Sequence, residues 1–336
     1  MRIGLIGAGA IARRHLEILA SRDVEIAAVA DTDSDRAEAA AGTGASIHHD
    51  WTAMLVGERL DAVLVCTPPG AHAGPTRAAL ERGIAVYVEK PLAREATDGA
   101  DIAAAHAAAA SVVCAVGYQW RSLDVLDALR AALGDAHPGL LVSRSFGDTE
   151  GGRGDLGTLG GGGSWFTDRA RSGGILFELG SHDIDLQCAI GGPVTAVQGM
   201  AGSGRLALAG REGSGLDDTV SVMLRFAGGG IGVVSVGWNP TQDPAVYTLD
   251  VQARDVALAL ELDPRFHLRG RAHGQEIDAT ANADPRESSL DRFLEAVRAG
   301  DPSAVPCTPA DALHSLRVAL ACERAVAEGG TVLVQT

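Results

Sequence analysis

Short apolar runs alternate with helix-like stretches over the first 120 residues of the chain. The runs are continuous, as in strands buried on both faces of a parallel sheet, and they occupy residues 2–6, 24–30, 61–66, 85–88 and 112–116. The segments between them have apolar positions at helical spacing. Strands that alternate with helices predict an α/β Rossmann domain over residues 1–121.

The pattern changes after residue 139, where extended segments follow one another without intervening helices. These segments are residues 140–146, 194–200, 218–226, 231–238, 246–253 and 256–262. The glycine-rich residues 227–230 are typical of a hairpin turn. Consecutive strands joined by short turns predict an α+β domain over residues 122–336, with a large, mostly antiparallel open sheet and helices at 288–299 and 309–328.

A glycine-rich turn joins the first strand to the first helix. Gly7 permits a tight turn and Gly9 lets the backbone approach a pyrophosphate, while the small Ala12 allows the helix to pack closely on the strand. Ala10 and Ile11 open the helix, whose N-terminus would face the phosphates. Glycine-rich turns are common, so this motif alone is weak.

Asp31 strengthens the dinucleotide interpretation because it ends the second strand, about twenty residues further on. A carboxylate at this place would hold the ribose hydroxyls, and no arginine follows to accept a 2′-phosphate. The alternative is that Asp31 caps the helix that begins near Ser34. We predict NAD as the cofactor rather than NADP.

Polar turns follow the later strands of the first domain at the same edge of the sheet, where doubly wound folds bind ligands. The first of these turns contains Thr67, Pro68 and His72, and the second is residues 89–91, with Glu89 and Lys90. The last strand ends in a segment that includes Arg121.

A helix predicted from about residue 174 to 190 carries the strongest candidate for chemistry. Glu178 and His182 are four residues apart and His182 and Asp185 are three apart, so all three can share one face, whereas Asp183 is rotated away. Two carboxylates and an imidazole in one row can form a general base with its orienting partners. An ordinary solvated helix face remains the alternative.

Composition narrows the class of protein. A chain of 336 residues favours two domains, and its net charge of −15 disfavours nucleic acid or an anionic membrane as partner. Five cysteines without paired spacing indicate a reducing compartment and no structural zinc. No signal peptide or long apolar span precedes the first strand, so we expect a cytoplasmic protein.

Residues 148–163 form a glycine-rich segment just before Trp165. A loop of this length is usually functional or disordered. We interpret it as a flap beside the substrate, with Trp165 as a wall of the site; a surface excursion with Trp165 in the core is the alternative.

Four motifs in order resemble the glucose–fructose oxidoreductase and inositol dehydrogenase family (Gfo/Idh/MocA). They are residues 7–12, 67–72, 89–91 and 173–185. The resemblance implies an NAD(P)-dependent enzyme that acts on a sugar, inositol or related polyol. It also implies that the second domain binds substrate and that its open sheet forms a homodimer or homotetramer.

The resemblance also implies individual roles. Lys90 takes the place of the lysine that reaches nicotinamide and substrate, and Pro91 that of a proline often preceded by a cis bond. His182 and Asp185 match the family's catalytic helix, whereas Glu178 replaces an aspartate there and its partner could be Lys90 rather than His182.

We therefore predict a dehydrogenase of CH–OH groups in which His182 is the general base, Lys90 stabilises the alkoxide and Glu178 orients one of them. The predicted substrate-binding residues are Lys90, Arg121, Trp165, His182 and Asp185, and no metal is expected. The predicted cofactor-binding residues are Gly7, Gly9, Ala10, Ile11, Asp31, Thr67, Pro68, His72, Glu89 and Lys90. The alternatives are an NAD-dependent glycosidase of the same family and a non-catalytic NAD-binding regulator.

Overall fold

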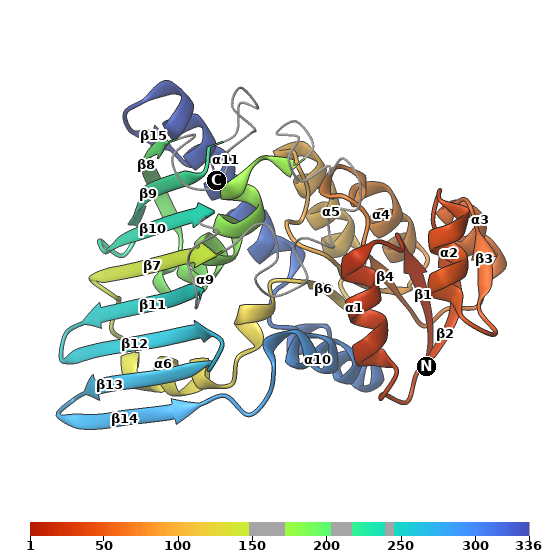
Figure 1. The fold of residues 1–336 in the computed structure, drawn as a ribbon, viewed down its shortest axis with the longest axis horizontal. Coiled ribbons are helices and arrows are strands. Elements are labelled where there is room, and N and C mark those ends of the chain that lie inside the picture. The colour runs from red at the N-terminus through yellow and green to blue at the C-terminus, as the bar shows by residue number, and fades with distance from the viewer. Residues whose placement is uncertain (148–171, 203–216, 239–244, 336) are drawn as a thin grey trace. The chain divides into compact units, whose positions relative to one another are not determined.

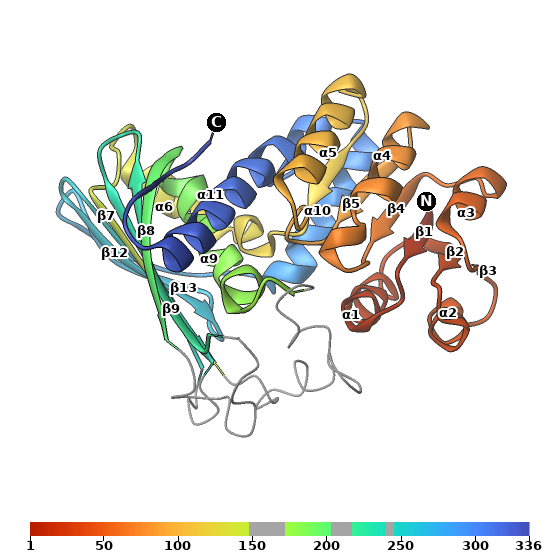
Figure 2. The same ribbon diagram turned by 90° about the horizontal axis from the view of Figure 1, so that it is seen from above.

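The computed structural model describes residues 1–147, 172–202, 217–238 and 245–335, which form two compact units (Figure 1, Figure 2). Unit 1 comprises residues 1–118 and 287–313, and unit 2 comprises residues 119–286 and 314–336. The predicted division at residue 121 did not anticipate that residues 287–313 pack with the first unit. The predicted flap and Trp165 lie outside the described residues.

Unit 1 contains a six-stranded sheet in which every pairing is parallel, in the order β3-β2-β1-β4-β5-β6. This is the Rossmann strand order, so the predicted fold class is confirmed. The strands are β1 (Arg2–Ile6), β2 (Glu25–Ala30), β3 (Ser46–His48), β4 (Ala62–Val65), β5 (Ala85–Val88) and β6 (Cys114–Val116). Every residue of β4, β5 and β6 is buried, which is why these strands are continuous apolar runs.

Helices cover both faces of this sheet, as in other doubly wound folds (Figure 2). They are α1 (Ala10–Leu19), α2 (Ser34–Ala41), α3 (Trp51–Gly57), α4 (Ala73–Glu81), α5 (Ala96–Ala108) and α10 (Pro285–Ala299), with 3-10 turns η1 (Pro69–Ala71) and η5 (Pro302–Ala304). Leu290, Phe293 and Leu294 of α10 are fully buried in one core cluster with Ile3 and Leu5 of β1. Helix α10, which begins at Pro285, thus completes the core of a unit whose strands all end by Val116.

The register of the parallel strands aligns their carboxyl ends. Ile6 pairs with Ala30 on one side and Val65 on the other, Val65 pairs with Val88, and Val88 pairs with Val116. The polar turns that follow these strands therefore leave the sheet at one level, as the sequence predicted.

Unit 2 contains a nine-stranded sheet in the order β14-β13-β12-β11-β7-β10-β9-β8-β15. All of its pairings are antiparallel except that between β7 and β10. The strands are β7 (Leu140–Gly147), β8 (Val194–Gly202), β9 (Thr219–Phe226), β10 (Ile231–Trp238), β11 (Val246–Ala253), β12 (Val256–Asp263), β13 (His267–Ala272), β14 (Gln275–Thr280) and β15 (Val332–Leu333). The large, mostly antiparallel sheet is confirmed, and β13 and β14 extend it beyond the predicted strands.

The described helices of unit 2 lie on one face of the sheet (Figure 2). They are η2 (Gln119–Ser122), α6 (Val125–Leu133), the π-helical segment η4 (Leu176–Gly180), α9 (Ser181–Gly191) and α11 (Pro309–Glu328). Helix α9 contacts the central strands β7 and β10, and α6 contacts β12, β13 and β14. Burial alternates along β9 and β12, so each has an inner apolar face and an outer, more exposed face.

Polar side chains form a layer between α9 and the inner face of the sheet. The Gln187 amide donates hydrogen bonds of 2.9 Å to the Ser143 hydroxyl and to the Val233 carbonyl. Asp183 is fully buried one helical turn earlier, and neither of its carboxylate oxygens has a hydrogen-bond partner among the described residues. Burial raises the pKa of Asp183 to about 7, and the nearby Ser145 and Ser143 hydroxyls offset only part of this effect.

We expect Asp183→Asn to stabilise the protein at pH 8 but not at pH 4. The pKa of Asp183 is raised to about 7 in the folded state from an ordinary 3.8. Below pH 3.8 the carboxyl is protonated in both the folded and the unfolded state, so it does not destabilise the fold there. Between these two pH values the unfolded state ionises first, so the buried carboxyl lowers the free energy of unfolding more and more as the pH rises. The upper bound of this destabilisation is about 4 kcal/mol. Urea-denaturation midpoints at the two pH values measure it.

The exposed carboxylate Asp127 provides the control, because Asp127→Asn changes the same group on the surface of α6. Equal midpoints for Asp183→Asn and the wild type at pH 8 would contradict the prediction.

Candidate cofactor and active site

The glycine-rich turn after β1 has the geometry of a phosphate-binding site. Gly7 adopts φ +89°, and a Cβ there would lie 2.8 Å from the Cys66 carbonyl carbon, so only glycine fits. A Cβ on Gly9, in contrast, would meet no atom within 4 Å. Helix α1 starts at Ala10 without a side-chain cap, so its first N–H groups are available to an anion.

Ala10 and Ile11 are half-buried in the first turn of α1, as predicted for residues at the mouth of such a site. Ala12 is fully buried, which fits its expected role in close helix–strand packing. These features fit a dinucleotide pyrophosphate.

Asp31 is hydrogen-bonded to the same turn. Its Oδ2 accepts a 2.6 Å hydrogen bond from the Ala8 N–H, and its Oδ1 accepts one of 2.8 Å from the Asp33 N–H. The cap of α2 is Asp33, which accepts a hydrogen bond from the Arg36 N–H, so the alternative role of Asp31 as a helix cap is excluded. Asp31 lies half-buried at the end of β2, beside the glycine-rich turn.

The turn after β4 contains three predicted cofactor residues in different environments. Thr67 is half-buried and Pro68 is exposed, whereas His72 is completely buried. The His72 ring joins two turns, because Nε2 lies 2.8 Å from the Thr67 carbonyl oxygen and Nδ1 lies 3.1 Å from that of Pro91. Burial lowers the pKa of His72, against the opposing effect of these carbonyls.

The turn after β5 carries Glu89, Lys90 and Pro91, and the bond between Lys90 and Pro91 is cis. Glu89 is buried and Lys90 is half-buried. Lys90 is also the one lysine of the chain: every other member of its 28 basic residues is arginine. The presence of a single lysine among so many arginines is visible in the sequence and marks Lys90, but the sequence analysis did not use it.

In unit 2, the segment with Glu178 and His182 is less regular than predicted. The first turn, Leu176–Gly180, is π-helical, and α9 follows directly. A π-turn is wider than an α-turn, so the four-residue spacing of Glu178 and His182 is not one regular α-helical turn. Such π-segments occur frequently at functional sites.

Trp120 was not among the predicted site residues, but its ring contacts that of His182. Their centroids are 5.1 Å apart at an interplanar angle of 45°, and His182 itself is half-buried. The Trp120 ring also packs edge-on against Tyr247, with centroids 6.3 Å apart. The Trp120 ring therefore packs against both His182 and Tyr247, a contact that spacing along one helix does not reveal.

Arg121 and Asp185 form a buried bidentate ion pair. Arg121 Nε donates to Asp185 Oδ2 at 2.7 Å and Nη2 donates to Oδ1 at 2.8 Å. The Ser315 hydroxyl donates a further 2.7 Å hydrogen bond to Oδ1. Both predicted substrate residues are thus brought together, and the Asp185 carboxylate fixes the Arg121 guanidinium.

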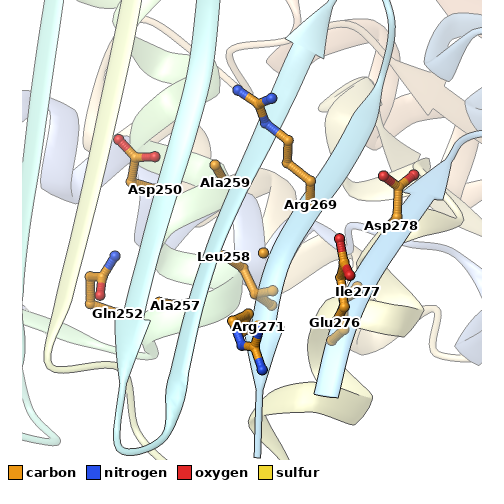
Figure 3. A pocket seen from close by; sticks show the side chains of 11 residues that line it. Asp250, Gln252, Ala257, Leu258, Ala259, Arg269, Arg271, Glu276, Ile277 and Asp278 are labelled. Atoms are coloured by element: carbon orange, nitrogen blue, oxygen red, sulfur yellow. The ribbon is translucent and has the colours of Figure 1, made fainter. Parts of the chain in front are cut away.

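A separate hollow lies on the outer face of the unit 2 sheet (Figure 3). Two cross-strand rows form it: Asp250, Ala259, Arg269 and Asp278 in one, and Gln252, Ala257, Arg271 and Glu276 in the other. The two alanines make the depression, and none of the predicted catalytic or cofactor residues lines it.

The described residues include no group of three or more His, Cys, Asp or Glu side chains that could hold a metal ion. None of their helices combines the length and apolar composition needed to cross a bilayer.

Comparison with known proteins identifies both units. Residues 1–118 match the family described as an oxidoreductase family with an NAD-binding Rossmann fold, and residues 140–270 match the GFO/IDH/MocA C-terminal domain. The cofactor of this Rossmann domain is therefore NAD.

Relatives match to different extents. Inositol 2-dehydrogenase 3 of Saccharopolyspora erythraea is 38% identical over 124 residues, which is 36% of this chain and only 37% of that protein. The rhizopine catabolism protein MocA of Rhizobium meliloti is 27% identical over 95% of this chain and 92% of its own length. The solved structure of a levoglucosan dehydrogenase with NADH and levoglucosan shares the fold, with TM-score 0.82 and 19% identity over 100% of this chain and 99% of that one.

We expect Gly9→Val to abolish NAD binding without unfolding the protein. The new side chain would point into open space in the structure, where the pyrophosphate needs to approach the backbone. Calorimetric titration with NAD⁺ and a thermal melt measure the two effects.

Gly7→Ala is the matched contrast, because its Cβ would collide with backbone and should lower stability as well as binding. Unchanged NAD affinity in Gly9→Val would show that the glycine turn has only a structural role.

Proposed function

We propose that this chain, which belongs to the GFO/IDH/MocA oxidoreductase family, uses NAD to oxidise a secondary alcohol of a sugar, inositol or related cyclic polyol, or to run the reverse reaction. The observation that carries the proposal is the position of the one lysine, Lys90, directly after a central strand of the NAD-binding sheet. Arginine serves at every other basic position, so charge alone does not explain a lysine here. A compact ammonium group suits a small developing oxyanion.

The proposed residue roles are those of an alcohol dehydrogenase. The nicotinamide, when bound, accepts the hydride from the alcohol carbon. His182 takes the hydroxyl proton, and Trp120 holds its ring in place. Lys90 stabilises the alkoxide, and Glu178 orients or tunes one of these two groups.

Substrate recognition is proposed for the buried Arg121–Asp185 pair. Since Asp185 already accepts hydrogen bonds from both Arg121 and Ser315, it acts by fixing the guanidinium, which contacts a neighbouring substrate hydroxyl. Trp165 is retained as a proposed wall of the site. The substrate class is supported by the relatives, which include inositol dehydrogenases and a D-apiose dehydrogenase.

We also propose that the protein forms a homodimer or homotetramer through the outer face of the unit 2 sheet. The half of this face over β7 to β10 exposes Leu140, Met200, Met223 and Ile231, by 38 to 81%. The other half carries the charged rows around the hollow (Figure 3). A second copy of the same face can bury the apolar half, and a face of this kind without a partner is unusual in a monomer.

A cytoplasmic location is proposed on the basis of the cysteines. All five are buried free thiols, which suits a reducing compartment.

We expect His182→Ala and Lys90→Ala each to lower kcat for NAD⁺ reduction, by about 10²–10⁴-fold for loss of the base. Because both groups act on one hydroxyl, the losses in the double variant should be far from additive. A screen of inositols and aldoses with purified protein, followed at the absorbance of NADH, provides the substrate for these measurements.

The same assay separates the alternatives. Release of one NADH per substrate oxidised identifies a dehydrogenase, turnover without NADH release identifies a glycosidase, and no turnover with intact NAD binding identifies a regulator. Near-normal kcat in His182→Ala would overturn the assigned proton transfer.

For the assembly, we expect Met223→Asp to shift the protein to a smaller mass in light scattering after size-exclusion chromatography. A charge in the centre of the apolar half cannot be buried without cost. Val56→Asp is the control, since Val56 is 71% exposed on α3 of unit 1. An unchanged mass for Met223→Asp, or a wild-type monomer, would contradict this interface.

A further inference from the structure

The roles proposed above leave one buried pair of polar residues in unit 1 unexplained. His15 of α1 and Glu89 at the end of β5 are only 2% and 7% exposed, and His15 Nε2 lies 2.7 Å from Glu89 Oε1. Replacing a buried polar pair with apolar residues is often neutral or stabilising. Stability is therefore a weak reason for its presence.

The His15 ring is held in one orientation by its neighbours. The ring of Tyr87 packs edge-on against it, with centroids 5.5 Å apart at 79°. The Tyr87 hydroxyl is in turn 3.0 Å from the Ser289 hydroxyl, and its ring packs on Phe293, both on α10. His15 Nδ1 has no hydrogen-bond partner among the described residues, so the ring is tied to its polar surroundings through Nε2 and Glu89.

The two carboxylate oxygens of Glu89 have different hydrogen-bond partners. While Oε1 faces His15, Oε2 accepts a 3.0 Å hydrogen bond from the Lys90 N–H. Gly117, which follows β6, leaves space for this carboxylate, because a Cβ there would lie only 3.1 Å from Oε1. One carboxylate therefore connects the phosphate-binding helix to the backbone of the residue that carries the ammonium.

The charges favour an ionised Glu89. Burial raises its pKa, but the His15 hydrogen bond and charge, together with the charge of Lys90, outweigh burial and lower the pKa below its ordinary value. Glu89 thus presents a carboxylate rather than a neutral acid to the Lys90 turn at neutral pH.

We propose that His15 and Glu89 are positioning residues that hold Lys90 against helix α1, so that the place of the ammonium is fixed relative to the site of the cofactor pyrophosphate. Neither residue needs to touch substrate. The inference rests on the proposed function of Lys90, but its central measurement requires no activity.

The single lysine makes that measurement direct. Reductive methylation with ¹³C-formaldehyde labels only Lys90 and the chain's α-amino group. The dimethyl resonance of Lys90 then reports its surroundings in the full-length protein, with the α-amino resonance as an internal reference. Lys90→Arg, which removes the signal, confirms the assignment.

The variants are chosen to keep the fold. Glu89→Gln preserves shape but removes the charge, and His15→Phe preserves a ring but removes the hydrogen bond. His15→Gln restores a donor near the position of Nε2. Ile18→Val is the control, because it shortens a buried apolar side chain of the same helix and leaves both polar groups of the pair in place.

We expect Glu89→Gln and His15→Phe to move the Lys90 resonance, with His15→Gln closer to wild type and Ile18→Val unchanged. With an oxidisable substrate, kcat should fall about 10- to 100-fold in the first two, as for a misplaced catalytic group, with the NAD dissociation constant changed less than about threefold. In the Lys90→Ala background the same substitutions should have almost no further effect on kcat.

Three results would overturn the proposal. They are an unmoved Lys90 resonance in both variants, an unchanged kcat, and a loss of kcat that persists in full when Lys90 is already absent. Failure to oxidise any polyol would instead count against the proposed function and leave the resonance test valid.

Discussion

The parallel register of the unit 1 sheet is the constraint on which the cofactor site depends. Because the last residues of β1, β2, β4, β5 and β6 are paired in one line, the residues after them emerge at one level. The glycine turn, Asp31 and the Lys90 turn are far apart in sequence, yet none of them needs a long loop to reach this edge. Short connections then allow hydrogen bonds between turns, such as those of Asp31 and His72, to fix their relative positions.

Helix α9 of unit 2 buries several polar side chains and still packs on a sheet. It does so by pairing: Asp185 is bound by Arg121 and Ser315, and Gln187 is bound by Ser143 and a strand carbonyl. Asp183 is the exception among these described residues, and its raised pKa is the result. Burial of a carboxyl group thus need not mean that the carboxyl is charged.

The sequence allowed prediction of the features that depend on local pattern. Continuous apolar runs identified the central strands of unit 1, and alternating runs identified β7 to β12 in unit 2. The short strand β3 was missed because its three residues carry no buried apolar run, and β13 and β14 because their exposed faces are charged. Some features arise from long-range packing and had no local signature in the sequence: the π-turn at Glu178, the Trp120–His182 contact and the His15–Glu89 pair. The single lysine, in contrast, can be read directly from the sequence.

The return of α10 to unit 1 has a consequence for synthesis of the protein. A ribosome releases the six strands of the Rossmann sheet well before it makes Leu290, Phe293 and Leu294, which complete their core. Until then, one apolar layer of the nascent domain is open, and Tyr87 lacks the Ser289 partner that anchors it beside His15. We therefore expect unit 1 to complete its core only after β7 to β14 of unit 2 have been made, and a truncated chain that ends before residue 285 to expose this apolar layer.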